Sequence, residues 1–420
     1  MKTTSAAGSP SRRFGKRDTK MTITTTAHPV DTDFYQIGDL LGDDDRNLIT
    51  RVRGFVDSEV LPVINEHWEL ADFPYQILPA LGELGIVGTA IQGYGCPGLT
   101  RLQTGLVAME LSRGDGSVNT LNAVHSGLAM GSIALLGDDE QKQRWLPEMA
   151  ALRKLGAFAL TEPEHGSDSV ALETTARREG DVYVIDGAKR WIGLGHVADI
   201  VIIWARDTAD SKVKAFVLEK NADGGYPDGY EAEAITGKIA KRAIQQAHIE
   251  ISGLRIPAGN KLAKSSSFRD VSAILNRTRS TVAWEALGHA LAAYEAAAAY
   301  VQERVQFGKP IASYQLVQNK LANMLADLTA MQLLCFRTAT LQDEGRLTNE
   351  QASLAKMFTG EHARALCRDA RDLLGGNGLL LENHVARHLT DMEVVHTYEG
   401  TDFIQSLIIG RQITGISAFA

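Results

Sequence analysis

Apolar residues recur at intervals of three and four along the first third of the chain, which predicts amphipathic helices. The acidic run Asp43–Asp45 can cap the first of these helices, and Pro62 is expected to bend or interrupt it. A second helix is expected to begin at Pro74 and to end at Gly85. The helical patterns that follow cover residues 99–113, 117–136 and 138–150.

The pattern changes at Gly156 to short β-branched runs bounded by Gly, Asp or Asn, which are typical of strands. The first strand should end at Pro163, and four more are expected at residues 181–187, 199–205, 213–218 and 247–251. Helical patterns return after about Ser266, over residues 281–306, 315–344, 348–374 and 401–416. The sequence therefore predicts an α+β chain in which an N-terminal helical domain, a small central β-domain and a C-terminal four-helix bundle follow one another.

These patterns divide the chain into a leader (residues 1–30), a helical domain (31–155), a β-domain (156–265) and a helical bundle domain (266–420). Residues 1–26 are rich in Ser, Thr, Lys and Arg, contain one acid and lack an apolar run, so a secretory signal is excluded. A mitochondrial transit peptide, a disordered leader and a natural start at Met21 all remain open. The expected location is the cytoplasm, or the mitochondrial matrix if residues 1–26 are a transit peptide.

Composition and charge exclude some classes of function. The 420 residues carry a formal net charge of -8, which gives no reason to expect binding to nucleic acid or to an anionic membrane. Cys96, Cys335 and Cys367 are widely spaced and odd in number, which predicts free thiols in a reducing compartment. His384 and His388 would share one helical face but have no evident third ligand, so we predict no metal site. No apolar run reaches about 18 residues, so we predict no membrane span.

The stretch Thr397–Thr401 places a carboxylate, Glu399, beside a glycine and before an apolar helical pattern. Taken alone, this favours a glutamate in the first turn of a helix, where it complements the helix dipole. Other motifs change that interpretation. They occur in a fixed order along the chain: Gly93–Leu99, Leu160–Pro163, Gly166–Asp168, Trp191–Gly193, Leu374–Gly378 and Tyr398–Thr401.

Together these motifs resemble the acyl-CoA dehydrogenases, flavin enzymes that desaturate acyl thioesters. The resemblance extends from about residue 45 to Phe419 and is greatest to the branch of glutaryl-CoA dehydrogenases and plant short-chain acyl-CoA oxidases. It implies FAD as cofactor, an acyl-CoA substrate, and electron-transfer flavoprotein or another acceptor as partner. It also implies a homo-oligomer, by family habit a tetramer. The chain has no G-x-G-x-x-G after a strand and no P-loop.

The resemblance also assigns residues to the cofactor. Hydrogen-bond donors fixed near the flavin would stabilise the negative charge of its reduced form. The flavin-facing residues would be Phe158, Leu160, Thr161, Ser167, Trp191, Ile192 and Gly193. The remaining cofactor residues would be Arg304, Phe307, Gln315, Leu374, Gly375, Gly376, Thr401 and Phe403. The positions matching Arg304 and Gln315 contact a neighbouring subunit's FAD in the family, and an arginine suits its pyrophosphate.

By the same resemblance, Glu399 removes the α-proton of the thioester and a hydride passes from the β-carbon to flavin N5, which yields a trans-2-enoyl-CoA. Ser167, Arg279 and Gly400 would lie at the acyl-CoA site, with Arg279 near the start of the alanine-rich helix. Asn119 stands where glutaryl-CoA dehydrogenases carry an arginine for the distal carboxylate. Because an unpaired buried carboxylate is costly, we expect a short or branched uncharged acyl chain rather than glutaryl-CoA.

Gly193 keeps one alternative open. Most members of the family carry a hydroxyl residue at this position, near flavin N5, and its loss could change the access of oxygen. An acyl-CoA oxidase with the same catalytic residues is therefore the nearer alternative. A flavin-dependent hydroxylase or a non-catalytic subunit on the same fold is the farther one, and the intact stretch Tyr398–Thr401 argues against it.

Overall fold

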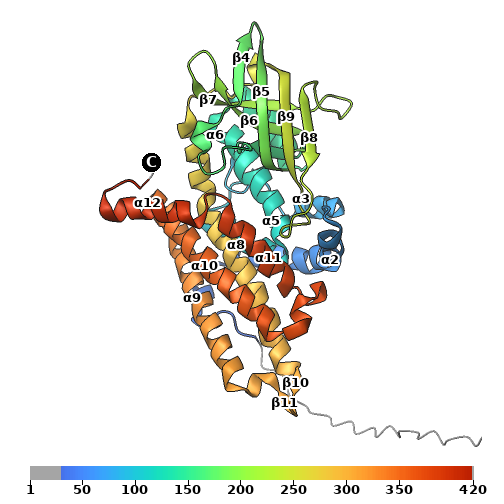
Figure 1. Ribbon diagram of the computed structural model, residues 1–420, viewed down its shortest axis with the longest axis vertical. Coiled ribbons are helices and arrows are strands. Elements are labelled where there is room, and N and C mark those ends of the chain that lie inside the picture. The colour runs from blue at the N-terminus through green and yellow to red at the C-terminus, as the bar shows by residue number, and fades with distance from the viewer. Residues whose placement is uncertain (1–29, 419–420) are drawn as a thin grey trace, which may run out of the picture.

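The computed structural model describes residues 30–418. Figure 1 shows an elongated molecule with a β-sheet at one end, a bundle of long helices at the other, and N-terminal helices at the junction between them. The three parts have the predicted order along the chain. The predictions made for residues 1–26 lie outside the described residues.

The N-terminal part is helical, as predicted. Pro62 lies in the first turn of α2, directly after the π-helical turn η2, so the predicted interruption is confirmed. The predicted helix over residues 117–136 is divided by a second π-helical segment, η4. The elements are η1 (Ile37–Leu40), α1 (Asp43–Phe55), η2 (Val56–Val60), α2 (Leu61–Leu70), η3 (Tyr75–Ile77), α3 (Leu78–Glu83), β1 (Gln92–Gly93), β2 (Cys96–Pro97), α4 (Arg101–Gly114), α5 (Gly116–Asn122), η4 (Ala123–Met130), α6 (Gly131–Leu136) and α7 (Asp139–Ala150).

The central part forms a seven-stranded sheet with the order β3-β6-β4-β5-β9-β8, in which β7 also pairs with β6. The strands are β3 (Gly156–Ala159), β4 (Thr175–Glu179), β5 (Val182–Gly193), β6 (Ile200–Asp207), β7 (Lys212–Glu219), β8 (Tyr230–Ala234) and β9 (Gln246–Pro257), with η5 (Ser169–Ala171) and η6 (Ala258–Asn260) in the connections. The first strand ends at Ala159 and not at Pro163, because the chain leaves the sheet as soon as its pairing with β6 ends. Strands β4 and β8 were not predicted, since both are short and polar.

The C-terminal part contains one helix more than predicted. Within the described residues its five helices are α8 (Phe268–Glu303), α9 (Gln315–Asp343), α10 (Asn349–Leu373), α11 (Val385–Thr397) and α12 (Asp402–Thr414). The shorter elements are β10 (Val305–Gln306), β11 (Lys309–Pro310), η7 (Ile311–Ser313), η8 (Gly375–Leu379) and η9 (Leu381–Asn383). The omitted helix is α11. His384 is its N-cap, with a φ of 59°, so His384 lies just outside the helix that carries His388.

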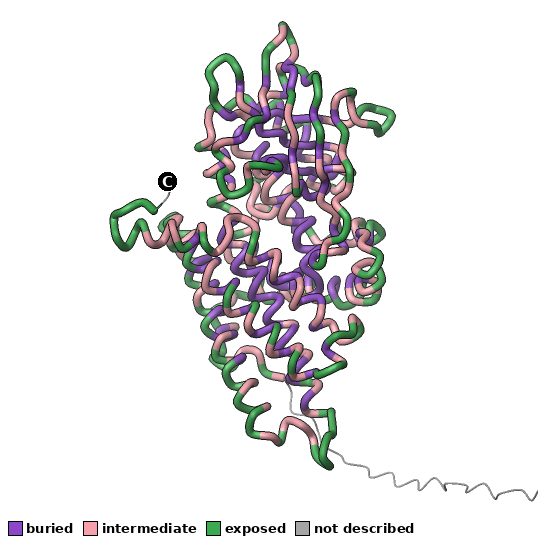
Figure 2. Tube along the Cα trace, in the orientation of Figure 1, coloured by how far each residue is buried: buried purple, intermediate pink, exposed green. Residues whose placement is uncertain are grey.

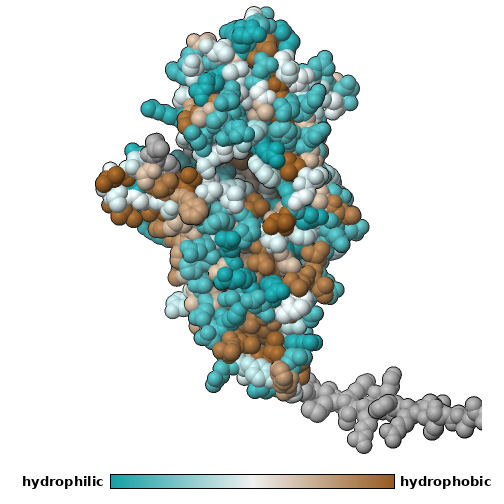
Figure 3. All heavy atoms as spheres, viewed as in Figure 1, coloured by the Kyte–Doolittle hydropathy of each residue, from teal (hydrophilic) through white to brown (hydrophobic). Residues whose placement is uncertain are grey.

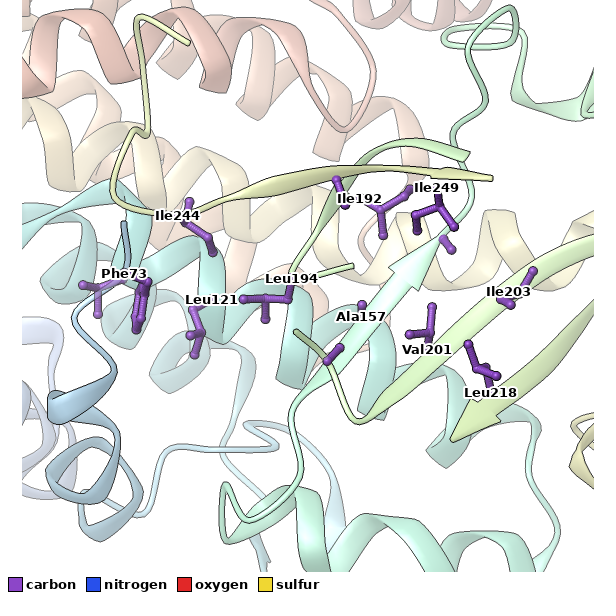
Figure 4. Close-up of a cluster of buried hydrophobic side chains, with 14 of the residues drawn as sticks. Phe73, Leu121, Ala157, Ile192, Leu194, Val201, Ile203, Leu218, Ile244 and Ile249 are labelled. Carbon is purple, nitrogen blue, oxygen red and sulfur yellow. The ribbon is translucent and has the colours of Figure 1, made fainter. Parts of the chain in front are cut away.

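Buried residues run through the sheet and along the inner faces of the bundle (Figure 2). Figure 4 shows one cluster in which Phe73 and Leu121 of the N-terminal part share an apolar core with Ala157, Ile192 and Val201 of the sheet. This shared core fixes α5 against the sheet, and a second cluster packs Ala129 and Met130 of η4 against Phe158 and Ile202. The three cysteines are free, as predicted. Among residues 30–418, no helix combines the length and apolar character that a membrane span requires.

Candidate active site

Glu399 lies in the connection between α11 and α12, before the helix predicted over residues 401–416, and not in a first helical turn as the stretch taken alone would favour. Helix α11 ends at Thr397, and α12 begins at Asp402 with Thr401 as its N-cap. The backbone of Glu399 has a φ of 54°. A non-glycine residue in this region stores strain of about 1–3 kcal/mol, so the surrounding contacts must hold it there.

Two buried side chains hold this connection through its carbonyl groups. The amide Nε2 of Gln405 donates to the carbonyl oxygens of Glu399, at 3.0 Å, and of Gly400, at 2.9 Å. Lys356 of α10 donates through Nζ to the Gly400 carbonyl at 2.8 Å and to Oδ1 of Asp402 at 2.9 Å. The Lys356 side chain is fully buried, so these bonds form away from competing water.

The Glu399 carboxylate accepts a hydrogen bond of 3.1 Å from Oγ1 of Thr278 on α8. Burial raises the pKa of Glu399 to about 7, while the Thr278 hydrogen bond and the cations Arg279 and Lys356 act in the opposite direction. The neighbouring carboxylate of Glu285 raises this pKa further. A carboxyl group with a pKa near working pH can be ionised and still be an effective base.

Arg279 lies inside α8 and not near its start, because the helix begins at Phe268. The expected conflict with the helix dipole is therefore absent. Its buried guanidinium donates to the side chains of Asn276, Asn349 and Ser353. It makes no ion pair among residues 30–418, and its Nε has no partner there. Its positive charge is thus left to act on Glu399.

The residues predicted to face the flavin come together at the sheet. The backbone N–H of Arg190 donates to the Thr161 carbonyl at 2.9 Å, which places Thr161 beside Trp191. The buried Lys189 donates through Nζ to the Leu160 carbonyl at 3.1 Å and fixes the end of this segment. Phe158 is buried in β3, and Ile192 is buried in β5. Ser167 is exposed in the connection between β3 and β4.

Trp191 is the residue of this group that could cover a planar ligand. It interrupts the pairing of β5 with β9, has a φ of 65° and leaves 53% of its surface exposed. An exposed tryptophan held in a strained conformation near Thr161 fits the isoalloxazine ring of FAD, which presents an aromatic face and polar edges. Thr161 and Trp191 would hold that ring.

The π-helical segment η4 connects the flavin-facing residues to Glu399. A Cβ added to Gly193 would lie 3.3 Å from Cγ2 of Val124, and one added to Gly127 would lie 3.3 Å from Cγ2 of Thr278. Gly193 and Thr278 therefore pack on neighbouring turns of η4, and Thr278 in turn contacts Glu399. Irregular π-helical turns of this kind are frequent at functional sites. Asn119 is buried one to two turns earlier, on α5.

A second group of predicted residues lies at the far end of the bundle (Figure 1). Arg304 follows the last residue of α8, Phe307 is 94% exposed at the tip of the β10–β11 hairpin, and Gln315 opens α9. Leu374, Gly375 and Gly376 lie close by, because Nδ2 of Asn377 donates to Oη of Tyr300 near the end of α8 at 2.9 Å. Within one chain, the structure does not bring this group to Trp191 and Thr161. Thr401 and Phe403 belong to the start of α12, beside Glu399.

The comparisons with known proteins agree with this arrangement. Three family models match the chain in order: the N-terminal domain of acyl-CoA dehydrogenases over residues 42–153, the middle domain over 157–254 and the C-terminal domain over 268–414. An acyl-CoA dehydrogenase from Bacillus subtilis (strain 168) is 34% identical over 369 residues, which cover 87% of this chain and 96% of the relative. The mitochondrial short-chain specific acyl-CoA dehydrogenase of Bos taurus is 32% identical over 86% of this chain and 88% of the relative.

A crystal structure of a glutaryl-CoA dehydrogenase from Mycobacterium smegmatis in complex with FADH2 superimposes with a TM-score of 0.89 at 36% identity, covering 92% of this chain and 98% of that one. The fold and the site thus define a flavin-dependent oxidoreductase. More narrowly, the chain belongs to the acyl-CoA dehydrogenase family, and its cofactor is FAD.

The structure adds site residues that sequence reasoning missed. Thr278 stands next to a predicted residue, Arg279, but nothing in the sequence indicates that its hydroxyl reaches Glu399. Lys356 is a charged residue on the buried stripe of α10, whose other members are uncharged, and that mismatch could have identified it. Lys241 and Glu285 lie too far apart in the sequence for spacing to suggest that they pair.

Proposed function

We propose that Glu399 removes the α-proton of an acyl-CoA thioester and that the product is a trans-2-enoyl-CoA. The observation that carries this proposal is the half-buried carboxyl group of Glu399, whose pKa is raised by desolvation to about 7 and which accepts a hydrogen bond from Thr278. Bound FAD supplies the acceptor for the hydride that leaves the β-carbon. The backbone N–H of Glu399 makes no hydrogen bond within residues 30–418 and could therefore donate to the thioester carbonyl, which acidifies the α-proton.

The variant Glu399→Gln tests this proposal. It keeps the size and one hydrogen-bond acceptor of the side chain but removes the base, so the protein should retain FAD and yet fail to bleach it with butyryl-CoA under anaerobic conditions. Glu393→Gln is the matched control, since Glu393 lies on α11 in a solvent-exposed pair with Arg364. Normal bleaching by Glu399→Gln would sink the assignment.

We also propose a short or branched, uncharged acyl chain as the substrate. The relatives do not decide which acyl chain this protein takes, because one is named for short-chain and another for glutaryl substrates. The charges near Asn119 support the proposal. Lys241 donates to Oγ1 of the adjacent Thr120, but its charge is already neutralised by Glu285. At Asn119, a distal carboxylate would therefore meet a neutral amide and, beside Thr120, a cation that Glu285 already pairs, which leaves the desolvation of that carboxylate without a local countercharge.

Butyryl-CoA, isobutyryl-CoA and glutaryl-CoA at equal concentration provide the test. Bleaching should be fast with one or both of the uncharged substrates and at least about tenfold slower with glutaryl-CoA, since a pairing worth about 1.4 kcal/mol corresponds to a factor of ten. Conversion of glutaryl-CoA to crotonyl-CoA with release of carbon dioxide at a comparable rate would contradict the proposal.

The electron acceptor is proposed to be an electron-transfer flavoprotein or a similar carrier. The specific observation that favours oxygen instead is Gly193, which carries no hydroxyl and packs against Val124. Admission of air to the substrate-reduced protein separates the two cases. One hydrogen peroxide per enoyl-CoA, formed at the rate of turnover, would identify an oxidase.

We further propose a homotetramer in which Arg304, Phe307, Gln315, Gly375 and Gly376 contact the FAD of a neighbouring subunit. Their distance from Trp191 within one chain supports this arrangement. The proposed division of the chain remains a leader over residues 1–30 and domains over 31–155, 156–265 and 266–420. The change from helix to strand after α7, and back to helix at α8, supports the two inner boundaries.

A further inference from the structure

A buried ionic cluster lies directly beside the base segment. Lys241, in the connection between β8 and β9, forms an ion pair with Glu285 of α8, and the two side chains are 1% and 2% exposed. Lys241 Nζ also donates to Oγ1 of Thr120 on α5 and to Oη of Tyr398, each at 2.8 Å. The Tyr398 hydroxyl donates to Glu285. One cluster therefore joins residues from the helical, β and bundle parts of the chain.

Stability alone gives a weak reason for such a cluster. Burying two charges costs several kcal/mol per ion, and well-packed apolar side chains of similar volume are often as stable or more so. An ion pair instead fixes geometry, because its hydrogen bonds hold the groups bonded to it in defined positions. Here the defined partner is Tyr398, whose ring also lies 4.6 Å from Lys241 Nζ in a cation–π contact.

Tyr398 is the residue before Glu399 and the C-cap of α11. The strained connection at Glu399 is therefore fixed from two sides. On the far side, Lys356 and Gln405 bind the carbonyl groups of Glu399 and Gly400. On the near side, the side chain of Tyr398 is fixed only through the hydroxyl contacts of the cluster and its packing. A rotation of Tyr398 would turn the peptide that carries Glu399.

We propose that Lys241 and Glu285 are positioning residues for Glu399, and that they act through the hydroxyl of Tyr398. The inference rests on the proposed function, in which Glu399 is the base. Reacting groups must be held in place closely, since a misplacement of about 1 Å can slow an enzyme about a hundredfold. Neither Lys241 nor Glu285 transfers a proton in this scheme.

The cluster also affects the ionisation of the base. As a like charge, Glu285 raises the pKa of Glu399, and neutralising it should lower that pKa. Other charged or titratable groups also lie near Glu399, its connection or the cluster, and all of them are unchanged in a variant of Glu285 alone. They are Arg279 on α8, Lys356 on α10, Asp391 and His396 on α11, Asp402 on α12 and Lys241 itself.

The test uses the FAD-bound full chain and four variants: Tyr398→Phe, Glu285→Gln, Lys241→Met and the double variant Lys241→Met/Glu285→Leu. We expect Tyr398→Phe and Glu285→Gln to lower the limiting rate of anaerobic bleaching by butyryl-CoA about tenfold or more. The substrate concentration that gives half the maximal rate should change less than about threefold, because none of these variants removes a contact that binds the acyl-CoA itself. Glu285→Gln should also move the midpoint of the rate–pH profile to lower pH, a change that a general loss of packing does not produce.

The remaining variants separate positioning from folding. Lys241→Met leaves Glu285 buried without its cation and can unfold the protein, whereas the double variant removes both charges and should fold while staying slow. Lys214→Met breaks the partly buried Lys214–Asp207 pair of the β6–β7 hairpin and should bleach at the normal rate. Normal rates and an unchanged pH midpoint in Tyr398→Phe and Glu285→Gln, with Glu399→Gln inactive, would overturn this inference alone. A fully active Glu399→Gln would overturn the base assignment as well.

Discussion

At the scale of single residues, the balance of charges around Glu399 predicts how the reaction depends on pH. Its pKa of about 7 means that the carboxylate, the active form, becomes populated as pH rises through neutrality. At low acyl-CoA concentration, the rate of flavin bleaching depends on the ionisation of groups in the free enzyme. This rate should therefore rise with pH and level off above about 8. Stopped-flow measurements between pH 5.5 and 9 would show a flat profile if Glu399 is not the base.

Arg279 provides a second prediction at this scale. Its cation lowers the pKa of Glu399, so the variant Arg279→Gln should shift the midpoint of the profile upward by about one unit. Arg277→Gln is the matched control, because Arg277 is exposed two residues earlier on the same helix. Equal shifts in both variants would mean that net charge, and not the position of Arg279, controls the base.

Sequence motifs identified Glu399 but not what tunes it. Its environment comes from residues 43 to 121 positions away, namely Lys356, Glu285 and Thr278, and no local spacing encodes such contacts. The start of the helix predicted over residues 401–416 agrees with α12, which begins at Asp402. Taken alone, the stretch favours a first-turn position for Glu399, but Thr401 takes the N-cap and leaves Glu399 in a left-handed conformation before the helix.

At the scale of elements, Lys356 of α10 fixes the connection between α11 and α12. Replacing it by methionine removes one of the two donors to the Gly400 carbonyl and the lysine partner of the partly buried Asp402, which should cost about 3–5 kcal/mol of stability. Urea unfolding of the FAD-bound protein measures this loss. The control Lys320→Met breaks the more exposed pair with Asp369 and should cost less than about 1 kcal/mol. Similar losses in both variants would contradict a special role for Lys356.

Element prediction succeeded where the periodic signal was long and failed where it was short or polar. The amphipathic run of α10 agrees with its prediction to within a residue at each end. Strand β4 reads Thr-Ala-Arg-Arg-Glu and β8 reads Tyr-Glu-Ala-Glu-Ala, and both exist because neighbouring strands pair with them. Helix α8 begins early because Ser267 and Asp270 form a capping box upstream of the alanine-rich run. Tertiary pairing and capping, rather than hydrophobic period, determined these elements.

At the scale of the whole molecule, the α5–η4 segment holds the site together. Thr120 reaches the cluster beside Glu399, Val124 packs against Gly193, and Gly127 packs against Thr278. The flavin-facing end of the sheet and the base at the bundle are thus joined by one helical run of the N-terminal part. The order of the three parts was predictable from the sequence, whereas this junction depends on contacts between all three and was not.

The far end of the bundle carries the last prediction. Apolar side chains are exposed there, and Figure 3 shows hydrophobic surface at this end of the molecule; they include Val305, Phe307, Leu316, Leu379 and Leu380. Exposed apolar patches of this kind mark contact sites between proteins. If this surface meets a neighbouring subunit at its FAD, Phe307→Asp should lower both the mass of the assembly and the FAD content per chain. Light scattering and flavin absorbance measure the two.

The control is Leu70→Asp, since Leu70 is also exposed but ends α2 in the N-terminal part. It should change neither quantity. The decisive comparison is between the two losses in Phe307→Asp. Parallel loss means that a subunit completes the cofactor site of its neighbour. The separation of the β10–β11 hairpin from β5 within one chain requires this if both Phe307 and Trp191 contact FAD (Figure 1). A dissociated protein that keeps one FAD per chain would show that the flavin-facing residues suffice, and the assignment of Arg304, Gln315 and Gly375 to the cofactor would then be wrong.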